Sequence, residues 1–519
     1  MLYTPRFVSL YFLKDTLAVT KFTITKCLQQ PIFEAMKRAF VINILLLLAL
    51  NLFVKPLYIF GIDVQIQNTI GPEQYGLFFS IFNYTLLFQF ILEYGITNFV
   101  KREISIEPGR IHTYFSGLLI LKAGFAMMYF GVVLGFAWLF QYSDNEIRLI
   151  IQVAGIQFFI TVVAFLRGLI IGQGWYKTDS IFSVLDKVIM ILLLGWRLYW
   201  PGMQPPDLAY FVETYLLSVV ITAIIVFIFM LFRLHLKWVK PDLSFLKTLI
   251  IRLTPYTLIT FLMGVYGRLD SVLLHALLPD GDYQAGIYAA GFRMLDTYLM
   301  LAILFSNLLL PMLSAQQGNK DAIRDLLKFV VGIVMTTTII AGVGGWVFRQ
   351  EITDVLYHQS DANWYDTVGL LFLTMIPVGL STLYGAAIIS TGRLHRQNIL
   401  FLSGIVLSLT LNFLFIPWWQ SLGSAISAFS VNLVIAVGQV IIFVKESDMG
   451  EDRGFYRRMI LFFILSFVLF YIATLLAKSF LIAGLIAGIV LLWISKLLGL
   501  MRIDMEMAKK LFSGKGRNG

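Results

Sequence analysis

Long apolar runs separated by short polar segments are the dominant pattern along the chain. Most runs are roughly 20 residues long, which is the length that a helix needs to cross a hydrocarbon core of about 30 Å. About fourteen such runs occur, so the pattern predicts an all-α integral membrane protein. The predicted transmembrane helices are, in chain order, about residues 40–67, 75–100, 113–140, 147–172, 178–200, 208–232, 250–277, 284–312, 327–348, 365–390, 397–417, 423–444, 459–476 and 479–499.

One polar turn between two apolar runs occurs twice. Residues 71–78 read GPEQYGLF and align without a gap with residues 281–288, which read GDYQAGIY. Residues 170–174 and 388–392, each with two isoleucines before a glycine, form a second pair with a similar offset. Two matches at a similar offset indicate a duplicated helical bundle. In membrane transporters such repeats usually face each other across a central substrate path.

The distribution of basic residues predicts the orientation in the membrane. The net charge is +10, with 40 Lys and Arg against 30 Asp and Glu. About 30 of the 40 basic residues fall in the alternate loops that share a side with both termini, which places both termini in the cytoplasm. In a soluble protein this charge would suggest a nucleic-acid partner. Here we expect none, because apolar residues make up 59% of the chain and charged residues only 13%.

The chain divides into four predicted segments. Residues 1–38 form a cytoplasmic N-terminal segment without a signal-peptide pattern, which is either amphipathic or lies before the true start of translation. Residues 39–240 hold spans one to six, residues 241–445 hold spans seven to twelve, and residues 446–519 hold the last two spans and a basic cytoplasmic tail. All external loops are short, so no extramembrane stretch is long enough to fold as a domain.

The sequence contains none of the common catalytic motifs. HExxH, GxSxG and GxxxxGK[ST] are absent, so we expect no enzyme activity and no cofactor. Asp280 and Asp282 resemble the metal-binding acid pair of some glycosyltransferases, but Asp and Gly are also the expected residues of a short external turn. The five histidines show no ligand spacing, and the lone Cys27 excludes a multi-cysteine site, so no metal is predicted.

Charged residues inside the predicted spans are the strongest functional signal, because a charge in the hydrocarbon region is costly and tends to face a cavity or a partner. Lys55 and Arg293 lie nearest mid-membrane and are candidates for lining a substrate path. For Arg293 the alternative is an ion pair with Asp296, three residues further along the same helical face. Arg268 and Asp270 are two residues apart and cannot both face one cavity squarely. The other charged residues within spans are Lys122, Arg167, Lys187, Glu93, Asp186 and Glu213.

Lys55 is followed by Pro56, which removes a helical hydrogen bond and kinks the helix. A charge beside a helix break in mid-membrane is a common way to build a site or a hinge in transporters, so Pro56 is a candidate hinge. The alternative is a passive kink. Pro255 and Pro377 are similar candidates without an adjacent charge.

Several short motifs, through their order along residues 39–445, resemble one known family. The turn GPEQYG at residues 71–76 is followed by FILEYGI at residues 90–96 and by a basic pair. The motifs of the second half are LDSVLL at 269–274, GIYAAGFR at 286–293, Gly392-Arg393, Asn412, Ile416-Pro417 and Gly423-Ser424-Ala425. In this order they resemble the bacterial polysaccharide (O-antigen type) flippases of the multidrug/oligosaccharidyl-lipid/polysaccharide exporter superfamily. Ser271 stands where that family usually has a basic residue.

The resemblance implies a fold, a function and a location. The fold is two six-helix lobes related by a pseudo-two-fold axis around a central cavity, with two further C-terminal helices, in the bacterial cytoplasmic (inner) membrane. The function is to carry an undecaprenyl-diphosphate-linked oligosaccharide from the inner to the outer leaflet by alternating access, for cell-surface polysaccharide such as lipopolysaccharide O-antigen. The implied partners are the lipid-linked oligosaccharide, membrane lipids, a polysaccharide polymerase and chain-length machinery.

The resemblance also implies roles for the charged residues, because a diphosphate needs cationic groups at membrane depth. The implied cavity cations are Lys55, Arg268, Arg293, Lys122, Arg167 and Lys187. The implied carboxylates for ion coupling or pairing are Asp270, Asp296, Glu93 and Asp186.

Three other functions stay open at this point. A related exporter of small cationic compounds and a flippase for the peptidoglycan precursor would both share the fold, and neutralising Lys55 and Arg293 should matter less for cation export. A membrane polymerase or glycosyltransferase acting on the same lipid is disfavoured by the short external loops and by the internal duplication.

Overall fold

Helices are the only regular elements in the part of the chain that the computed structural model describes, and no strand occurs there. The described residues are 50–501, except 52, 108, 110, 235–241, 316–318, 392–393, 448–452 and 478. The predicted all-α fold is therefore confirmed. The predicted N-terminal segment, the first residues of the first span and the basic tail lie outside the described residues.

Among the described residues, nine helices are long and apolar enough to cross a membrane, or ten if the bent pair Pro72–Leu87 and Gln89–Lys101 is one span. The predicted number of fourteen is not confirmed. Part of the difference lies in α17 (Leu394–Ser447), which holds two predicted spans and is interrupted at Gln420, where φ is 51° and ψ is −127°. The rest of the difference lies in the first, fifth and seventh predicted spans. The first is described only in part, and the other two are divided into shorter helices.

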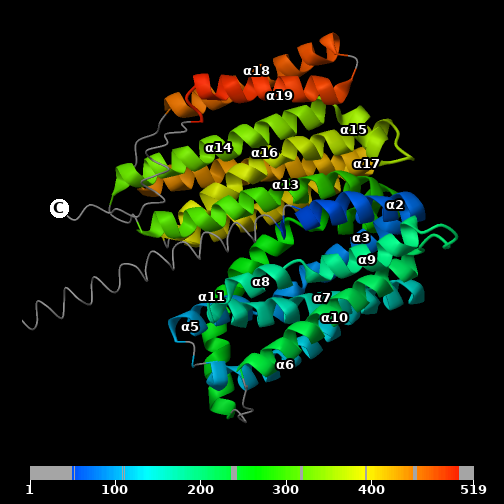
Figure 1. Ribbon diagram of the computed structural model, residues 1–519, viewed down its shortest axis with the longest axis vertical. Coiled ribbons are helices and arrows are strands. Elements are labelled where there is room, and N and C mark those ends of the chain that lie inside the picture. Colours follow the sequence, from blue (N-terminus) through cyan, green and yellow to red (C-terminus); the bar gives the residue numbers. More distant parts are fainter. Residues whose placement is uncertain are drawn as a thin grey trace, which may run out of the picture.

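The described part of the predicted first lobe, residues 39–240, runs from residue 50 to residue 234 (Figure 1). Its first span changes into a π-helix, η1 (Ile59–Asp63), soon after Pro56. Single π-helical turns are rare and frequent at functional sites. The other elements are α2 (Val64–Ile70), α3 (Pro72–Leu87), α4 (Gln89–Glu93), α5 (Ile96–Ile106), α6 (Ile111–Leu139), α7 (Asp144–Gly172), α8 (Tyr176–Phe182), α9 (Leu185–Tyr199) and α10 (Leu208–Leu234).

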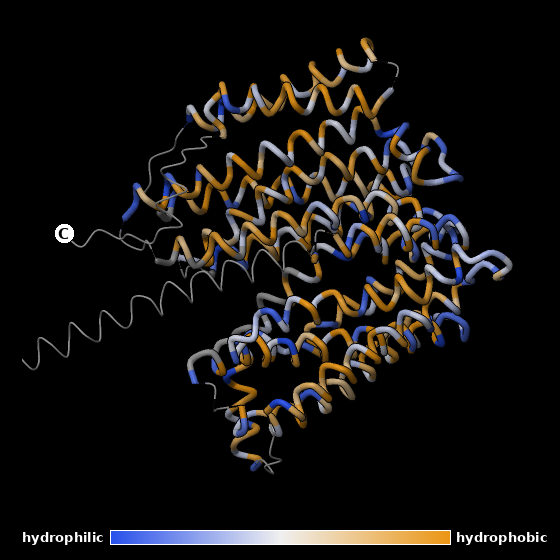
Figure 2. The backbone as a smooth tube through the Cα atoms, in the orientation of Figure 1, coloured by the Kyte–Doolittle hydropathy of each residue, from blue (hydrophilic) through white to orange (hydrophobic). Residues whose placement is uncertain are grey.

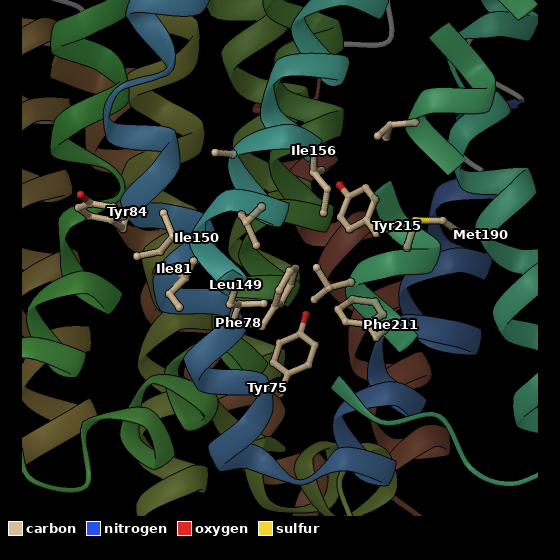
Figure 3. Packing of buried hydrophobic residues seen from close by; sticks show 14 of the residues in the cluster. Tyr75, Phe78, Ile81, Tyr84, Leu149, Ile150, Ile156, Met190, Phe211 and Tyr215 are labelled. Atoms are coloured by element: carbon tan, nitrogen blue, oxygen red, sulfur yellow. The ribbon is translucent and has the colours of Figure 1, made fainter. Parts of the chain in front are cut away.

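Aromatic side chains of α3 and α10 form the centre of the core of the first lobe (Figure 3). The rings of Phe78 and Phe211 meet edge to face with 4.9 Å between their centroids. Tyr75 and Tyr215 each pack against Phe211. Such pairs add stabilisation beyond their buried area. This packing fixes α3, whose Tyr75 also reaches the boundary with the second lobe.

The second lobe follows in the same order of packed helices. Its elements are α11 (Leu243–Tyr266), α12 (Leu269–Leu277), α13 (Gly281–Ala315), α14 (Lys320–Val347), α15 (Arg349–Leu356), α16 (Ala362–Thr391) and α17. The last two helices, α18 (Arg453–Leu476) and α19 (Phe480–Leu497), lie beside α14 at the outer edge of this lobe, at the top of Figure 1. Figure 2 shows hydrophobic residues along the long helices and hydrophilic residues gathered toward helix ends, as expected for helices whose sides face lipid.

The seventh predicted span is broken and touches both lobes. In α11, Leu249 and Leu253 are buried in a cluster with residues of α5, α6 and α7, and the ring of Phe245 stacks on Tyr114 at 6.0 Å. The chain then breaks at residues 267–268, and α12 packs on α13 and α17. A division of the lobes at residue 240 stays a prediction, because the first half of α11 is part of the first lobe's core.

The two copies of the repeated turn lie against each other. A Cβ atom on Gly76 would lie 1.8 Å from the carbonyl oxygen of Asp282, and a Cβ atom on Gly286 would lie 2.0 Å from the carbonyl oxygen of Pro72. The sixth residue of each copy thus touches the second residue of the other. Reciprocal contacts of this kind are produced by a two-fold axis. Only glycine allows α3 and α13 to approach this closely.

Candidate functional site

Two adjoining cavities lie around α13. The first has a volume of about 270 Å³ and lies between the lobes, and we name it the inter-lobe cavity. Its polar lining residues are Lys55, Tyr58, Asp63, Tyr75, Lys187, Arg293 and Asp296. The second, the C-lobe cavity, has a volume of about 480 Å³ and is lined by α12, α13, α16 and α17. Phe292 and Asp296 line both cavities, so the two meet at this turn of α13.

Arg293 lies at the centre of the inter-lobe cavity and is only 6% exposed. Its Nε donates to Oδ2 of Asp63 at 2.7 Å, and its Nη1 donates to Oε1 of Gln67 at 3.0 Å and to the hydroxyl of Tyr357. The guanidinium also lies 4.8 Å from the ring centroid of Tyr75. Its Nη2 has no hydrogen-bond partner among the described residues. The cation is therefore held across the lobe boundary with one donor group unused.

The predicted alternative for Arg293, an ion pair with Asp296, is wrong. Asp63 of the first lobe occupies that place, and Asp296 pairs instead with Arg268, with 3.8 Å between Nη1 and Oδ2. Helical spacing places Asp296 on the same face of α13 as Arg293. The contact between the lobes brings the carboxylate of Asp63 closer to the guanidinium. Asp63 was missed, although it lies within the predicted first span and the rule for charges within spans would have included it. Gln67 and Tyr357 carried no comparable signal.

Arg268 reaches the C-lobe cavity from the break between α11 and α12. Its Nη1 also donates to Oδ1 of Asn83 at 3.3 Å, and its guanidinium lies 5.1 Å from the ring centroid of Phe292. Asp270 lies in the same wall, but its oxygens accept hydrogen bonds at 2.8 Å from Tyr288 and from Asn412. The two charges serve different neighbours, but the prediction that they cannot both face one cavity is wrong, since both line the C-lobe cavity. Arg268 lies in the non-helical break before α12, so helical spacing does not set its direction.

Two lysines of the first lobe complete the inter-lobe cavity. Lys187 lies 3.4 Å from Oδ2 of Asp186, and its Nζ lies 4.6 Å and 4.4 Å from the ring centroids of Tyr58 and Tyr215. For Lys55 no hydrogen bond or ion pair occurs within the described part of the chain. Pro56 precedes η1, and Gly61 in this π-helix accepts a hydrogen bond from the Tyr199 hydroxyl at 2.6 Å. The backbone is distorted at the proposed hinge; movement there stays a prediction.

The other candidates lie outside both cavities. Arg167 forms two hydrogen bonds with Asp179, at 2.7 Å and 3.2 Å, and Lys122 donates to the carbonyl oxygen of Leu92 at 3.4 Å. Glu93 ends α4, and its buried Oε2 has no partner among the described residues. These contacts fit structural roles within the first lobe. The substrate-binding roles that the resemblance implied for Lys122 and Arg167 gain no support from this placement.

A cluster of four residues joins the lobes beyond the repeated turns. His275 lies 2.6 Å from Oδ1 of Asp282 and 3.5 Å from Oε1 of Glu146, and its ring stacks on Tyr142 at 5.5 Å. Tyr142 lies in the turn between α6 and α7, where burial, with Glu146 and Asp282 nearby, raises the pKa of its phenol to about 12. Asp282 is thus paired with a histidine. Among the described residues, no three His, Cys, Asp or Glu side chains are placed so that they could hold a metal ion.

Comparison with known proteins gives one family and several similar folds. A family model described as "Polysaccharide biosynthesis protein" matches residues 40–317. The structure is similar to that of a lipid II flippase, MurJ, in an inward closed conformation, with a TM-score of 0.67 and 13% identity over 87% of this chain and 98% of that one. It is also similar to a multidrug resistance MATE family transporter of the MOP superfamily in an inward-facing conformation, with a TM-score of 0.59 and 15% identity over 78% and 98%.

A third similar structure is a MOP superfamily transporter from Pyrococcus furiosus, with a TM-score of 0.57 and 17% identity over 80% of this chain and 96% of that one. Identities this low establish a shared fold and nothing more about substrate. The search of curated proteins gives no match.

Proposed function

Since the chain belongs to the polysaccharide biosynthesis protein family, whose model matches more than half of its 519 residues, we propose that it is a flippase for an undecaprenyl-diphosphate-linked oligosaccharide. It is a multi-pass membrane protein with the fold of MOP-superfamily transporters. In the proposed function it moves this lipid from the inner to the outer leaflet of the bacterial cytoplasmic membrane, with both termini in the cytoplasm. It acts there alongside a polysaccharide polymerase and chain-length machinery.

The observation that carries the proposal is the unused donor group of Arg293. Arg293 lines the inter-lobe cavity, and its buried Nη2 atom has no partner among the described residues. Lys55 lines the same cavity, also without a described partner. A buried N–H group without an acceptor is unfavourable, so the site is suited to an added acceptor. Charge-assisted hydrogen bonds from a guanidinium to phosphate oxygens are among the strongest in proteins. A diphosphate would supply these oxygens.

The lobe contacts support alternating access. Gly76 and Gly286 bring the repeated turns together, and Arg293 with Asp63 links the lobes one helical turn or more away. The π-helical turn η1 and the break at residues 267–268 interrupt the regular α-helix of the first and seventh predicted spans, which correspond to each other. A diphosphate that draws Arg293 away from Asp63 would weaken one of these links. Binding and rearrangement of the lobes would then be coupled.

A deletion strain tests the proposed function. Lipid-linked glycans would be located with a membrane-impermeant lectin or glycosidase on sealed cells. We expect full-length repeat units to collect on the cytoplasmic side and surface polysaccharide to be lost. Wild-type protein should restore export, Arg293→Gln should not, and Arg349→Gln should, because Arg349 pairs with Asp366 outside both cavities. Normal arrival of the glycan at the outer leaflet in the deletion strain would contradict the proposal.

A flippase for the peptidoglycan precursor is the second candidate, favoured by the similarity of the fold to the MurJ lipid II flippase. Both substrates would carry a diphosphate, so the inter-lobe cavity does not separate them. Complementation does: the second candidate requires this protein to sustain growth of cells depleted of their own lipid II flippase. We expect it to fail in that test.

A further inference from the structure

The C-lobe cavity differs from the inter-lobe cavity in the chemistry of its wall. Its charged lining residues are Arg268 in the break before α12, Asp270 in α12 and Asp296 near the middle of α13. The rest of the polar lining consists of neutral hydroxyl and amide side chains. These are Tyr288, Ser306, Ser381, Thr382, Gln397, Ser408, Asn432 and Gln439. Within the described residues, the wall away from Asp296 is therefore polar but uncharged.

Two buried amides in this wall lack partners. Gln397 and Gln439 are 3% and 1% exposed, and the Oε1 atom of each has no hydrogen-bond partner among the described residues. They lie on the two arms of α17 and converge beside Gly385 of α16. A Cβ atom there would lie 3.3 Å from Nε2 of Gln439 and 3.4 Å from Nε2 of Gln397. The two amide groups therefore meet in the cavity wall, and their oxygens are buried without a described donor, whereas buried amide oxygens are normally satisfied.

The neighbouring hydroxyl and amide groups do not supply that donor. Thr382 donates to the carbonyl oxygen of Val378 at 2.8 Å, and Asn432 donates to that of Ala428 at 2.8 Å. Ser306 donates to the carbonyl oxygen of Thr382 at 3.3 Å. Ser306 and Thr382 thus use their single hydroxyl hydrogen on a helix backbone, and Asn432 uses one of its two amide hydrogens there. Among the described residues, no group donates to the two glutamine oxygens, so a ligand in the cavity is a candidate donor.

A hydrogen-bond donor is what the two glutamine oxygens lack in the described part of the chain, and the three parts of the proposed substrate differ in whether they offer one. A diphosphate offers acceptor oxygens, and an isoprenoid tail offers neither donors nor acceptors. Sugar hydroxyl and amide groups offer neutral donors, which match an uncharged wall with unpaired oxygens. The cavity volume of about 480 Å³ is within the usual range of roughly 300–1,000 Å³ for small-molecule pockets.

We propose that the C-lobe cavity is a glycan subsite, in which Gln397 and Gln439 accept hydrogen bonds from a sugar while the diphosphate occupies the inter-lobe cavity. This inference rests on the proposed function and names the residues that distinguish one glycan from another. Phe292 and Asp296 line both cavities, so a sugar and the diphosphate attached to it can lie on either side of this turn of α13.

The chain contains a matched control for these two residues. Gln157 in α7 is 1% exposed, and neither Oε1 nor Nε2 has a partner among the described residues. It does not line the C-lobe cavity. Replacing an unpaired buried amide by an apolar side chain of similar size is nearly neutral or stabilising when no ligand uses it. Gln157→Leu should therefore affect neither binding nor transport.

The test compares two probes on the purified full-length protein. One probe is undecaprenyl diphosphate without sugar. The other is the undecaprenyl-diphosphate-linked glycan extracted from the deletion strain. We expect the double variant Gln397→Leu/Gln439→Leu to bind the glycan lipid about tenfold more weakly than wild type, since two net hydrogen bonds are lost. Its affinity for the probe without sugar should stay within about twofold, which also shows that it is folded. Gln439→Leu alone serves if the double variant loses thermal stability.

Three results would overturn the inference. Unchanged binding of the glycan lipid would show that the amides do not contact it, and equal weakening for both probes would assign the cavity to the lipid tail or to folding. Equal binding of both probes by the wild-type protein would show that the glycan adds nothing to the affinity. Wild-type protein that binds neither probe would instead contradict the proposed function itself, and the inference with it.

Discussion

The inter-lobe cavity and the C-lobe cavity adjoin at Phe292 and Asp296, yet their walls leave opposite kinds of polar group unpaired. Counting only partners in the described part of the chain, Nη2 of Arg293 in the first is a donor without an acceptor, and the Oε1 atoms of Gln397 and Gln439 in the second are acceptors without donors. A single ligand that satisfies both must offer anionic acceptors at one end and neutral donors at the other. A glycosyl diphosphate has this polarity, whereas a small organic cation does not.

The largest effect is expected from separating the structural and ligand-binding roles of Arg293. Arg293→Gln leaves Asp63 buried without its cation, which should lower the free energy of unfolding by about 3–5 kcal/mol. The double variant Asp63→Asn/Arg293→Gln removes both charges and should recover most of that stability. It should still fail to bind undecaprenyl diphosphate. Thermal unfolding and binding of this probe measure the two roles, and wild-type affinity in the double variant would show that Arg293 is only structural.

The contact between the repeated turns should be nearly as sensitive. Gly286→Ala places a Cβ atom 2.0 Å from the carbonyl oxygen of Pro72, so α3 and α13 must separate. Overpacking of this kind typically lowers the free energy of unfolding by about 1–3 kcal/mol. Transport in complemented cells should fall with it. Gly124→Ala in α6 is the control, since no atom lies within 4 Å of its added Cβ. Equal behaviour of the two variants would remove the glycine contact from the mechanism.

A substitution of Lys55 should change ligand binding in the inter-lobe cavity without changing stability, because no described group pairs with this lysine. Lys55→Gln should weaken binding of undecaprenyl diphosphate about tenfold, a change of roughly 1.4 kcal/mol, without lowering the unfolding temperature. Lys187→Gln is the contrasting variant, since Lys187 is held by Asp186 and two tyrosine rings and should lose stability as well. An unchanged affinity in Lys55→Gln would place the diphosphate elsewhere.

The smallest effect is expected at the junction of the two cavities. Asp296 and Arg268 are partly exposed and 3.8 Å apart, so their ion pair contributes at most about 1 kcal/mol. Asp296→Asn removes a negative charge and frees Arg268, so binding of undecaprenyl diphosphate should tighten by about twofold to fivefold. Titration in detergent at low salt measures this. Weaker binding would assign Asp296 a direct part in holding the substrate or a coupling ion.

Much of the fold could be predicted from the sequence, because span length and the duplicated turn are local patterns. Residues 71–78 and 281–288 indicated two related bundles, and Gly76 and Gly286 meet as a repeat about a two-fold axis requires. The span number was not predictable by length alone. The first span turns π-helical at η1 and the seventh breaks at residues 267–268, and neither irregularity follows from the length of an apolar run.

The candidate site was predicted less completely, because its contacts join distant parts of the chain. Lys55 and Arg293 were named from their depth and Arg268 as a charge within a span, and all three line a cavity. The partner of Arg293 was not predicted, because helical spacing favours Asp296, whereas the contact between the lobes places Asp63 beside the guanidinium. Gln397 and Gln439 gave no signal in the sequence, since an amide becomes informative only when its burial and missing partner are known.

Reconstitution tests the central claim most directly. Purified protein would be placed in liposomes that carry the undecaprenyl-diphosphate-linked glycan from the deletion strain, and a membrane-impermeant lectin would report how much glycan reaches the outer surface over time. We predict rapid exposure of the inner pool with wild-type protein and Gln157→Leu, and no exposure above protein-free liposomes with Asp63→Asn/Arg293→Gln. Wild-type protein that leaves the inner pool inaccessible, or a double variant that exposes it at the wild-type rate, would contradict a flippase built on the inter-lobe cavity.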